Sequence, residues 1–479
     1  MYIVYLFLYI TSVSQVPTPW LSARLHDRSA HGIAADVGQL IKHGDLTTGA
    51  RMPPVRELAA ALGTSPSTVS GAWRQLRARG MLTGGGRAGM VVGDDVRTPR
   101  PIRYGDDGQE GDWGQGARFP LNRSVPDPGL LPDLHTALIE APASDDLNHY
   151  TRIPIVPRLA AAARAEWPYP AGDLMVANGG YEGLMLAVHT FLRPGDHVLL
   201  DNPATPRTRD ILDAVGCRIH FLDRDSEGIR PDALAAALPL RPAALLLQPA
   251  WHNPAGTMMS ERRRDELAAI IADHPLLVIE DDGHGPLVGE PVHCLGAVLE
   301  QQHLLVRSYS KSHGPDLRIA IVEGDRDSIE RVRAFRDYGS GWTSRPLQEA
   351  LAWMLTDAAT QRSVALARDT YHRRRRALHA ELVRRGVPVE EGCGLELWVP
   401  VRDERYAVVT LAAHQIAVVS GSRFTPADRP PHVRVSTGTL AEADAPEVAE
   451  ALARAAQLPF DSSLRSSLRE RGGSIDSRG

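Results

Sequence analysis

The sequence predicts an α/β protein in two parts: a small N-terminal helix–turn–helix module and a larger domain on a mostly parallel sheet flanked by helices. Two observations support this prediction. Residues 53–92 have the pattern of two short helices followed by a glycine-rich hairpin. After Pro120, helical patterns alternate with short aliphatic runs such as residues 197–201 and 243–248. Such alternation is typical of crossover units on a buried parallel sheet.

The composition is that of an ordinary soluble protein. The chain has 479 residues, 43% hydrophobic and 23% charged, with a net charge of -5, and at roughly 150 residues per domain it has room for about three domain equivalents. Its one long charge-free apolar run, residues 1–10, is short for a membrane span and lacks a basic flank. Three scattered cysteines argue against disulfides and a CxxC metal site. We expect a cytoplasmic protein with no metal and no membrane partner.

Charge sets the N-terminal part apart. Residues 21–100 hold 11 Lys and Arg against 6 Asp and Glu, although the whole chain is acidic. A basic module at one end of a chain is typical of a nucleic-acid binder, because attraction to phosphate supplies most non-specific affinity. An ordinary small domain rich in arginine gives the same charge, so charge alone leaves both interpretations open.

The helical pattern of this module fits DNA recognition. Ser65 is placed as the N-cap of the second helix, with Pro66 at the first helical position. The start of a recognition helix meets base edges, and arginines further along meet phosphates. Residues 80–92 look like a β-hairpin wing. A small helical bundle is the alternative.

Residues 44–46 (GDL) and 49–59 (GARMPPVRELA) resemble the winged helix–turn–helix domain of the GntR superfamily. The resemblance implies that Arg56 contacts the DNA backbone. The family's recognition helix usually opens Ser-Arg-x-Thr, whereas residues 65–68 read SPST, so the operator sequence or the affinity should differ. The residues expected to contact DNA are Arg56, Ser65, Ser67, Thr68, Arg74 and Arg87.

Lysine is rare in this chain. Of the 53 basic residues only Lys42 and Lys311 are lysines. Arginine is never usefully deprotonated, whereas a lysine amine can act as a nucleophile and form a Schiff base. A lysine retained where arginine is otherwise used throughout is therefore a candidate for chemistry that arginine cannot perform, and Lys311 is the first candidate.

Residues 307–319 (RSYSKSHGPDLRI) resemble the pyridoxal phosphate lysine motif of fold type I aminotransferases. The resemblance implies that Lys311 forms an aldimine with the cofactor's aldehyde. It also implies that Ser308, Ser310 and Arg318 hold the cofactor's phosphate, the arginine through its fixed fork of donors. A surface lysine would be the alternative if lysines were not so rare here.

Three further segments occur in the order that this fold requires. In residues 177–184 (ANGGYEGL), the amides of Gly180 and Tyr181 would meet the phosphate at a helix N-terminus. Residues 248–256 (QPAWHNPAG) resemble the family's Asn-Pro-x-Gly motif, which implies that Asn253 hydrogen-bonds the phenolic oxygen. After the strand at residues 275–279, register points to Asp281 as the partner of the pyridine nitrogen.

Two more residues match functional residues of the aminotransferase family by register. Tyr150 matches the family tyrosine that reaches the phosphate of the neighbouring subunit, which implies a homodimer with shared sites. Arg434 matches the arginine that clamps a substrate carboxylate, or it is simply a strand-edge residue. It would lie in the small C-terminal α+β subdomain that the fold implies.

Two departures from the family pattern concern the cofactor. Thr205 stands where the family usually has an aromatic residue stacked on the ring, and Gly283 stands where some members have a tyrosine. Both predict weakened or altered cofactor binding, or a reshaped substrate pocket. The Schiff-base, pyridine and phosphate residues are all present, so we still expect the cofactor to bind.

The order of domains resembles the MocR type of transcriptional regulator. We expect a DNA-binding regulator that carries pyridoxal phosphate on Lys311 and senses the cofactor or an amine or amino acid, with little or no physiological transamination. Alternatives are a genuine aminotransferase with an appended DNA-binding domain, and a regulator that has lost cofactor dependence. The expected parts are an N-terminal extension (1–20), the winged helix domain (21–93), a linker (94–118), the aminotransferase-like domain (119–460) and a disordered tail (461–479).

Overall fold

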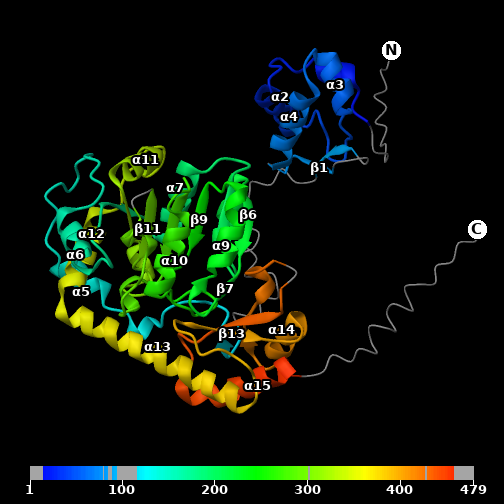
Figure 1. Ribbon diagram of the computed structural model, residues 1–479. Coiled ribbons are helices and arrows are strands. Elements are labelled where there is room, and N and C mark those ends of the chain that lie inside the picture. Colours follow the sequence, from blue (N-terminus) through cyan, green and yellow to red (C-terminus); the bar gives the residue numbers. More distant parts are fainter. Residues whose placement is uncertain are drawn as a thin grey trace, which may run out of the picture. The chain divides into compact units, whose positions relative to one another are not determined.

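The computed structural model describes residues 15–78, 80–84, 89–93, 116–299, 302–426 and 429–457. The chain divides into two compact units, residues 1–101 and 102–479 (Figure 1). Arg87, the predicted tail and most of the predicted linker lie outside the described residues.

The N-terminal unit is a winged helix–turn–helix, as the sequence predicts. Gly63 ends the first motif helix in the left-handed conformation, at φ 63°, and the Ser65 hydroxyl accepts a hydrogen bond from the Thr68 amide at 3.1 Å, which caps the second. The wing is an antiparallel hairpin in which Leu82 pairs with Val92. The elements are α1 (Thr18–Ser22), α2 (Ala30–Lys42), α3 (Val55–Leu62), α4 (Pro66–Ala78), β1 (Leu82–Gly84) and β2 (Met90–Val92).

Residues 15–20, which the sequence analysis assigns to an N-terminal extension, pack into this unit. Val16 is 7% exposed and belongs to the same buried cluster as Leu21 and Leu58. The Val16 amide donates to the Arg51 carbonyl at 2.8 Å, and the Thr18 hydroxyl donates to Glu57. The described start of the chain is therefore part of the core of the N-terminal unit.

Truncating Val16 should destabilise this unit. The substitution Val16→Ala removes buried methyl groups and should cost about 2 kcal/mol. Hydrogen exchange of amides in α3 and α4 of the full-length protein should accelerate accordingly. Val409→Ala, at a 65% exposed position in the large unit, is the control. Unchanged exchange in Val16→Ala would show that residues 15–20 do not support the unit.

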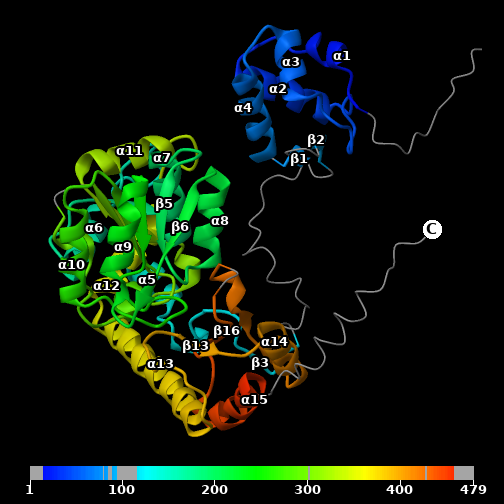
Figure 2. The same ribbon diagram turned by 45° about the vertical axis from the view of Figure 1, so that its right-hand side comes forward.

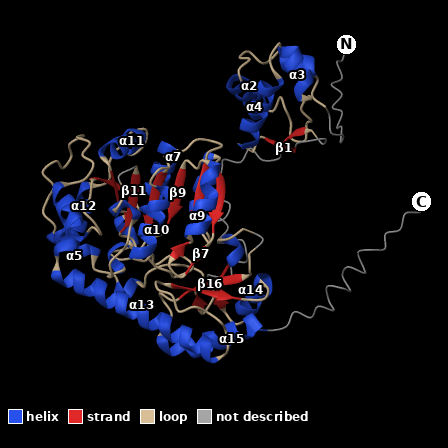
Figure 3. Ribbon diagram, viewed as in Figure 1, coloured by secondary structure: helices blue, strands red, loops and turns tan. Residues whose placement is uncertain are grey.

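The large unit is built on a central sheet, drawn in red in Figure 3. This sheet has seven strands in the order β4-β12-β11-β10-β9-β5-β6. Every neighbouring pair is parallel except those of β12, which runs antiparallel to both β11 and β4. The predicted mostly parallel sheet is thus confirmed. The strands are β4 (Asp173–Ala177), β5 (His197–Asp201), β6 (Arg218–Leu222), β9 (Ala244–Leu247), β10 (Leu277–Asp282), β11 (His303–Ser308) and β12 (Ala320–Gly324).

Helices cover both faces of the sheet because successive strand residues point to opposite sides. Leu304 and Val306 of β11 join the buried cluster that contains residues of α7 (Gly180–Phe191), α8 (Pro206–Val215) and α11 (Arg326–Arg336). Leu305, between them, joins the cluster on the other face. The helices of that second face are α6 (Pro157–Glu166), α9 (Pro231–Ala237), α10 (Glu261–Ile271) and α12 (Arg345–Thr356).

The long helix α13 (Ala358–Arg384) leads from the sheet to the predicted C-terminal α+β subdomain (Figure 2). The first strand of the large unit, β3, pairs in parallel with β14 of this subdomain, which ties the two ends of the unit together. The remaining elements are α5 (Leu134–Glu140), α14 (Glu404–Ala413), α15 (Ala445–Gln457), β3 (Phe119–Pro120), β7 (Arg224–Asp225), β8 (Gly228–Ile229), β13 (Glu396–Pro400), β14 (Ile416–Ala417), β15 (Val419–Ser420) and β16 (His432–Ser436). Among the described residues, no helix is both long enough and apolar enough to span a membrane.

Candidate functional site

The sequence-predicted cofactor residues meet at one edge of the large sheet. The parallel strands β5, β9, β10 and β11 end at this edge, which is where ligands bind in open α/β sheets. Asp201 ends β5, Gln248 follows β9, Asp281 lies near the end of β10, and Ser308 ends β11. Lys311 comes three residues after Ser308 and is partly buried.

The amine of Lys311 is held by two side chains. Its Nζ donates to the hydroxyl of Ser124 at 3.0 Å and lies 2.9 Å from Nε2 of His284. Burial lowers the pKa of Lys311 below its usual value, and the charge of Arg434 acts in the same direction, against Glu396 and Asp281. A larger fraction of the amine is therefore in the neutral, nucleophilic form.

His284 accepts this hydrogen bond as a neutral imidazole. The ring is 1% exposed and packs edge-on against Trp251, with ring centroids 5.4 Å apart. Burial, followed by the charge of Lys311, lowers the pKa of His284 well below its usual value. His284 directly follows Gly283 and is the ring that contacts the lysine amine.

Asp281 is the carboxylate of β10 that faces the site. Its neighbours Glu280 and Asp282 point to the other side of the strand, where Glu280 accepts the amides of Leu295 and Gly296. The side-chain amide of Gln248 donates to Asp281 at 2.7 Å. Burial raises the pKa of Asp281 to about 6, and the bond from Gln248 opposes the shift.

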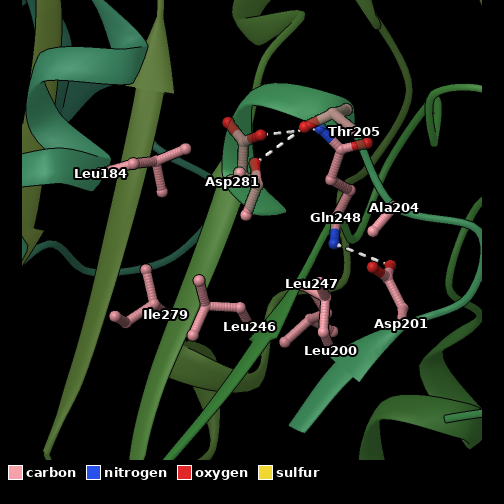
Figure 4. A pocket seen from close by; sticks show the side chains of 11 residues that line it. Leu184, Leu200, Asp201, Ala204, Thr205, Leu246, Leu247, Gln248, Ile279 and Asp281 are labelled. Atoms are coloured by element: carbon pink, nitrogen blue, oxygen red, sulfur yellow. Dashed lines mark hydrogen bonds between the residues drawn. The ribbon is translucent and has the colours of Figure 1, made fainter. Parts of the chain in front are cut away.

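Gln248 links Asp281 to the segment that carries Asn253. While its Nε2 bonds Asp281, its Oε1 accepts the backbone amide of Asn253 at 2.9 Å. Its own backbone amide donates to Asp201 at 3.3 Å, so Gln248 lies between the two aspartates in Figure 4. Asn253 is 8% exposed, and its Oδ1 has no hydrogen-bond partner among the described residues. A buried amide oxygen without a partner indicates that the site accommodates a further polar group.

The predicted phosphate end is the glycine-containing start of α7, which packs against Arg318 and Ser308. Gly179 has φ 96°, and a Cβ there would lie 2.7 Å from the Arg318 guanidinium. A Cβ on Gly180 would lie 3.3 Å from Ser308. The glycines thus let Arg318 and Ser308 approach the N-terminus of α7 closely, and this arrangement of a guanidinium, a hydroxyl and a helix N-terminus forms a cradle suited to an anion. Arg318 is exposed and donates to the Asn178 carbonyl at 2.8 Å.

Two other predicted phosphate residues, Ser310 and Tyr181, lie near the start of α7. The Ser310 amide donates to the Ser308 hydroxyl at 3.4 Å. Tyr181 is the second residue of α7, and its ring packs under the Arg207 guanidinium at 4.3 Å. An amine, a carboxylate and an anion cradle along one sheet edge fit pyridoxal phosphate, which carries an aldehyde, a ring nitrogen and a phosphate.

The two departures from the family pattern lie beside Asp281. Thr205 is 6% exposed, and its hydroxyl bonds that of Thr208 at 2.7 Å. It lines the same pocket as Asp281 and Ala204 (Figure 4). A Cβ on Gly283 would have only ordinary contacts, 3.7 Å from Asp281. Small residues therefore occupy the positions where the family places rings.

Of the two residues assigned by register, Tyr150 is exposed and Arg434 is buried. Tyr150 is 87% exposed and packs edge-on against Trp342, with ring centroids 5.9 Å apart. Arg434 is 8% exposed on β16 and donates to the Asn122 carbonyl. Its guanidinium lies 5.1 Å from the ring centroid of Phe424.

Of the predicted DNA-contacting residues that the structure describes, Ser65, Ser67 and Thr68 lie at the start of α4, Arg74 lies further along α4, and Arg56 lies on the neighbouring α3. The Ser65 hydroxyl bonds those of Ser67 at 2.6 Å and Thr68 at 2.8 Å. Arg56 and Arg74 are exposed and line one groove together with Arg51 and Arg77. Four arginines in one groove form a surface that attracts phosphate.

Sequence reasoning missed three side chains that contact the predicted site residues: Ser124, Gln248 and His284. Gln248 lies five residues before Asn253, in a segment already singled out, so its proximity could have been inferred. Ser124 lies 187 positions from Lys311, and no local pattern marks it. Only the folded chain brings it to the lysine.

Replacing Asp281 should change the pH dependence of stability. Because its pKa in the folded, cofactor-free protein is raised to about 6, the ionised carboxyl destabilises the fold above that pH. Asp281→Asn should therefore increase the unfolding free energy at pH 8 by roughly 2 kcal/mol, and the gain should largely disappear by pH 4. Chemical denaturation at both pH values measures this. Asp273→Asn, at an exposed position, is the control, and an equal gain at both pH values would contradict the burial of the Asp281 charge.

Relatives and families of known proteins match both units. Residues 119–452 match the family described as aminotransferase class I and II, and residues 29–92 match the gntR family of bacterial regulatory proteins. The vitamin B6 salvage pathway transcriptional repressor PtsJ of Salmonella typhimurium is 31% identical over 424 residues, covering 87% of this chain and 96% of PtsJ. The pyridoxine biosynthesis transcriptional regulator PdxR of Corynebacterium glutamicum is 26% identical over 356 residues, covering 72% of this chain and 76% of PdxR.

Solved aminotransferases share the fold of the large unit. The kynurenine aminotransferase of Pyrococcus horikoshii superposes with a TM-score of 0.64 at 22% identity, covering 70% of this chain and 90% of its own. The aminotransferase family thus accounts for most of the chain, and the gntR family accounts for its winged helix. This chain belongs to the aminotransferase class I and II family and, with its GntR-type DNA-binding domain, is a MocR-type transcriptional regulator.

Proposed function

We propose that pyridoxal phosphate held on Lys311 controls the DNA binding of this regulator. The observation that carries the proposal is the position of the Lys311 amine, partly buried at the sheet edge that also holds Asp281 and the glycine-lined anion cradle. When bound, pyridoxal phosphate supplies an aldehyde that reacts with primary amines and a ring that withdraws electrons. The alternative of a regulator that has lost the cofactor leaves the arrangement of these groups unexplained.

Different residues of the protein would hold different groups of the cofactor. Lys311 presents its amine, and His284 and Ser124 orient it. Asp281 would hold the proton of the ring nitrogen, with Gln248 fixing the carboxylate. The site residues named by the sequence for the other groups are Asn253, Gly180, Tyr181, Ser308, Ser310 and Arg318. Binding of the anionic phosphate at the start of α7 would be favoured by the helix dipole.

The names of the relatives support a vitamin B6 compound as the signal. PtsJ is named as a repressor of vitamin B6 salvage, and PdxR as a regulator of pyridoxine biosynthesis. Both are regulators, which favours regulation over the alternative of a genuine aminotransferase. The effector is the cofactor itself or an amine or amino acid that reacts with it.

We also propose a cytoplasmic homodimer. The ring of Tyr150, 87% exposed, would reach the phosphate of a second subunit, as the family resemblance implies. A dimer brings two winged helix units to two half-sites of an operator, and its geometry sets their spacing. Occupancy of Lys311 and the position of the DNA-binding units would then be coupled as two distinct sites.

Removing the Lys311 amine should uncouple DNA binding from the cofactor. In the native protein, pyridoxal phosphate should change the dissociation constant for DNA from its own promoter region by about tenfold, within the usual range of allosteric coupling. In Lys311→Ala and Lys311→Arg it should change nothing, because neither side chain can bind the aldehyde. Fluorescence anisotropy with and without the cofactor measures this. A cofactor response that persists in both variants would refute the proposal.

The arginine-lined groove should contact phosphates without reading sequence. Arg74→Ala and Arg56→Ala should each weaken binding to specific and non-specific DNA alike and reduce the salt dependence of log K by about 1. Arg24→Ala is the matched control, since Arg24 packs over Trp20 outside this groove. Loss of binding to one sequence only would instead assign these arginines to base contacts.

A further inference from the structure

The segment that follows β10 places His284 beside the amine of Lys311. Nε2 of His284 lies 2.9 Å from Lys311 Nζ. A Cβ on Gly285 would lie 2.4 Å from the Ser308 carbonyl oxygen, so the backbone directly after His284 touches the end of β11. The Gly285 amide also donates to Asp282 at 2.9 Å. The ends of β10 and β11 therefore set the distance between the ring and the amine.

Packing keeps the ring of His284 in this place. His284 is 1% exposed, and so is Trp251, which packs edge-on against it with ring centroids 5.4 Å apart. Trp251 packs in turn against His372, with ring centroids 5.3 Å apart. Close packing leaves a buried ring few rotamers. Nε2 should therefore stay beside the nitrogen of Lys311 after that nitrogen has reacted.

Other polar and charged groups act on Lys311 from elsewhere in the fold. Ser124 accepts from its amine at 3.0 Å and donates to Glu396. Two carboxylates raise the pKa of Lys311 and one guanidinium lowers it; these groups belong to Glu396 of β13, Asp281 of β10 and Arg434 of β16. All three remain in the variants described below, so their effects are the same in each variant.

His284 is a neutral ring. Burial, followed by Lys311 and His252, lowers the pKa of His284 well below its usual value. A neutral imidazole carries its one N–H on either of its two nitrogens. Nε2 can thus accept from the lysine amine, and it can donate once that nitrogen has no hydrogen left to offer.

Pyridoxal phosphate would bring a second polar atom to this place. Its phenolic hydroxyl is attached next to the carbon that bears the aldehyde, so the phenolic oxygen is close to any nitrogen that binds the aldehyde. A side chain that contacts the Lys311 nitrogen is therefore also near this oxygen. Gly283, which stands where some family members have a tyrosine, has no side chain to reach it. His284 directly follows Gly283 and offers a ring nitrogen instead.

We propose that His284 donates a hydrogen bond from Nε2 to the cofactor's phenolic oxygen and thereby favours the unprotonated form of the nitrogen that Lys311 contributes. The inference rests on the proposed function, because it assumes that Lys311 holds pyridoxal phosphate. It makes His284 a direct cofactor contact that compensates for the tyrosine missing at Gly283.

The direction of the effect follows from the charges. When the nitrogen is protonated, it donates a hydrogen bond to the ionised phenolic oxygen. That bond is lost with the proton, and a donor from the protein then stabilises the charged oxygen. His284 should therefore lower the pKa of the nitrogen, whereas a ring that only accepted a hydrogen bond would raise it.

Two substitutions of equal length separate the hydrogen bond from packing. His284→Gln keeps an N–H donor, and His284→Met has none. The protonated and unprotonated forms of the linkage between the cofactor and Lys311 absorb at different wavelengths, so a pH titration of the loaded protein measures its pKa. We expect His284→Met to raise this pKa by about 1 to 2 pH units, because a hydrogen bond to a charged group contributes that much. His284→Gln should stay closer to the native value.

Equal pKa values in His284→Met and His284→Gln, or a lower value in His284→Met than in the native protein, would refute the proposal. His284→Phe is a second variant without a donor, with a ring of similar shape, and should raise the pKa by the same amount. His414→Met, at an exposed position, is the control and should leave the pKa unchanged. Circular dichroism checks that each variant is folded.

Cofactor loading is measured separately, by retention after borohydride reduction. A native protein that retains no cofactor on Lys311 contradicts the proposed function and, with it, this inference. A native protein that loads normally, with variants in which the donor makes no difference to the pKa, contradicts this inference alone.

Discussion

The hydrogen bonds of Gln248 hold together the sheet edge at which the predicted cofactor residues meet. It bonds Asp281 on β10 through one atom and the backbone of Asn253 through the other, while its main chain is bonded to Asp201 at the end of β5. Three separate parts of the chain are thereby fixed relative to one another. The parallel sheet makes this possible, because it delivers the ends of β5, β9 and β10 to one edge.

Burial at the same edge of the sheet shifts the pKa values of its ionisable groups away from their usual values. Burial raises the pKa of Asp281 to about 6 and lowers the pKa of Lys311 and of His284. Each shift favours the neutral form, because the surroundings solvate charge poorly. A ligand that brings a cationic ring nitrogen to Asp281 and an anionic phosphate to the start of α7 would supply the missing counter-charges.

Sequence reasoning located what depends on local pattern. The rarity of lysine singled out Lys311, strand alternation separated Asp281 from its acidic neighbours, and caps and glycines located the two motif helices. These features depend on spacing along the chain, which a single sequence displays. The mostly parallel sheet and the winged helix follow from the same kind of pattern, and both are present in the structure.

The partners of Lys311 depend instead on contacts between distant segments. Ser124 and Glu396 are 272 positions apart, and neither lies in a recognisable motif. The described part of the N-terminal extension was misjudged for a related reason. Val16 and Thr18 look unremarkable in sequence, and only their contacts with Arg51 and Glu57 make them part of the core.

The central claim is that Lys311 is the residue that carries pyridoxal phosphate, and the composition makes it unusually easy to test. The chain has only two lysines, Lys42 and Lys311. The protein is incubated with pyridoxal phosphate and reduced with borohydride, and its peptides are analysed by mass spectrometry. This experiment has to distinguish only two lysine side chains. The account predicts the pyridoxyl mass on the peptide containing Lys311. Modification of Lys42 instead, or of neither lysine, would contradict it.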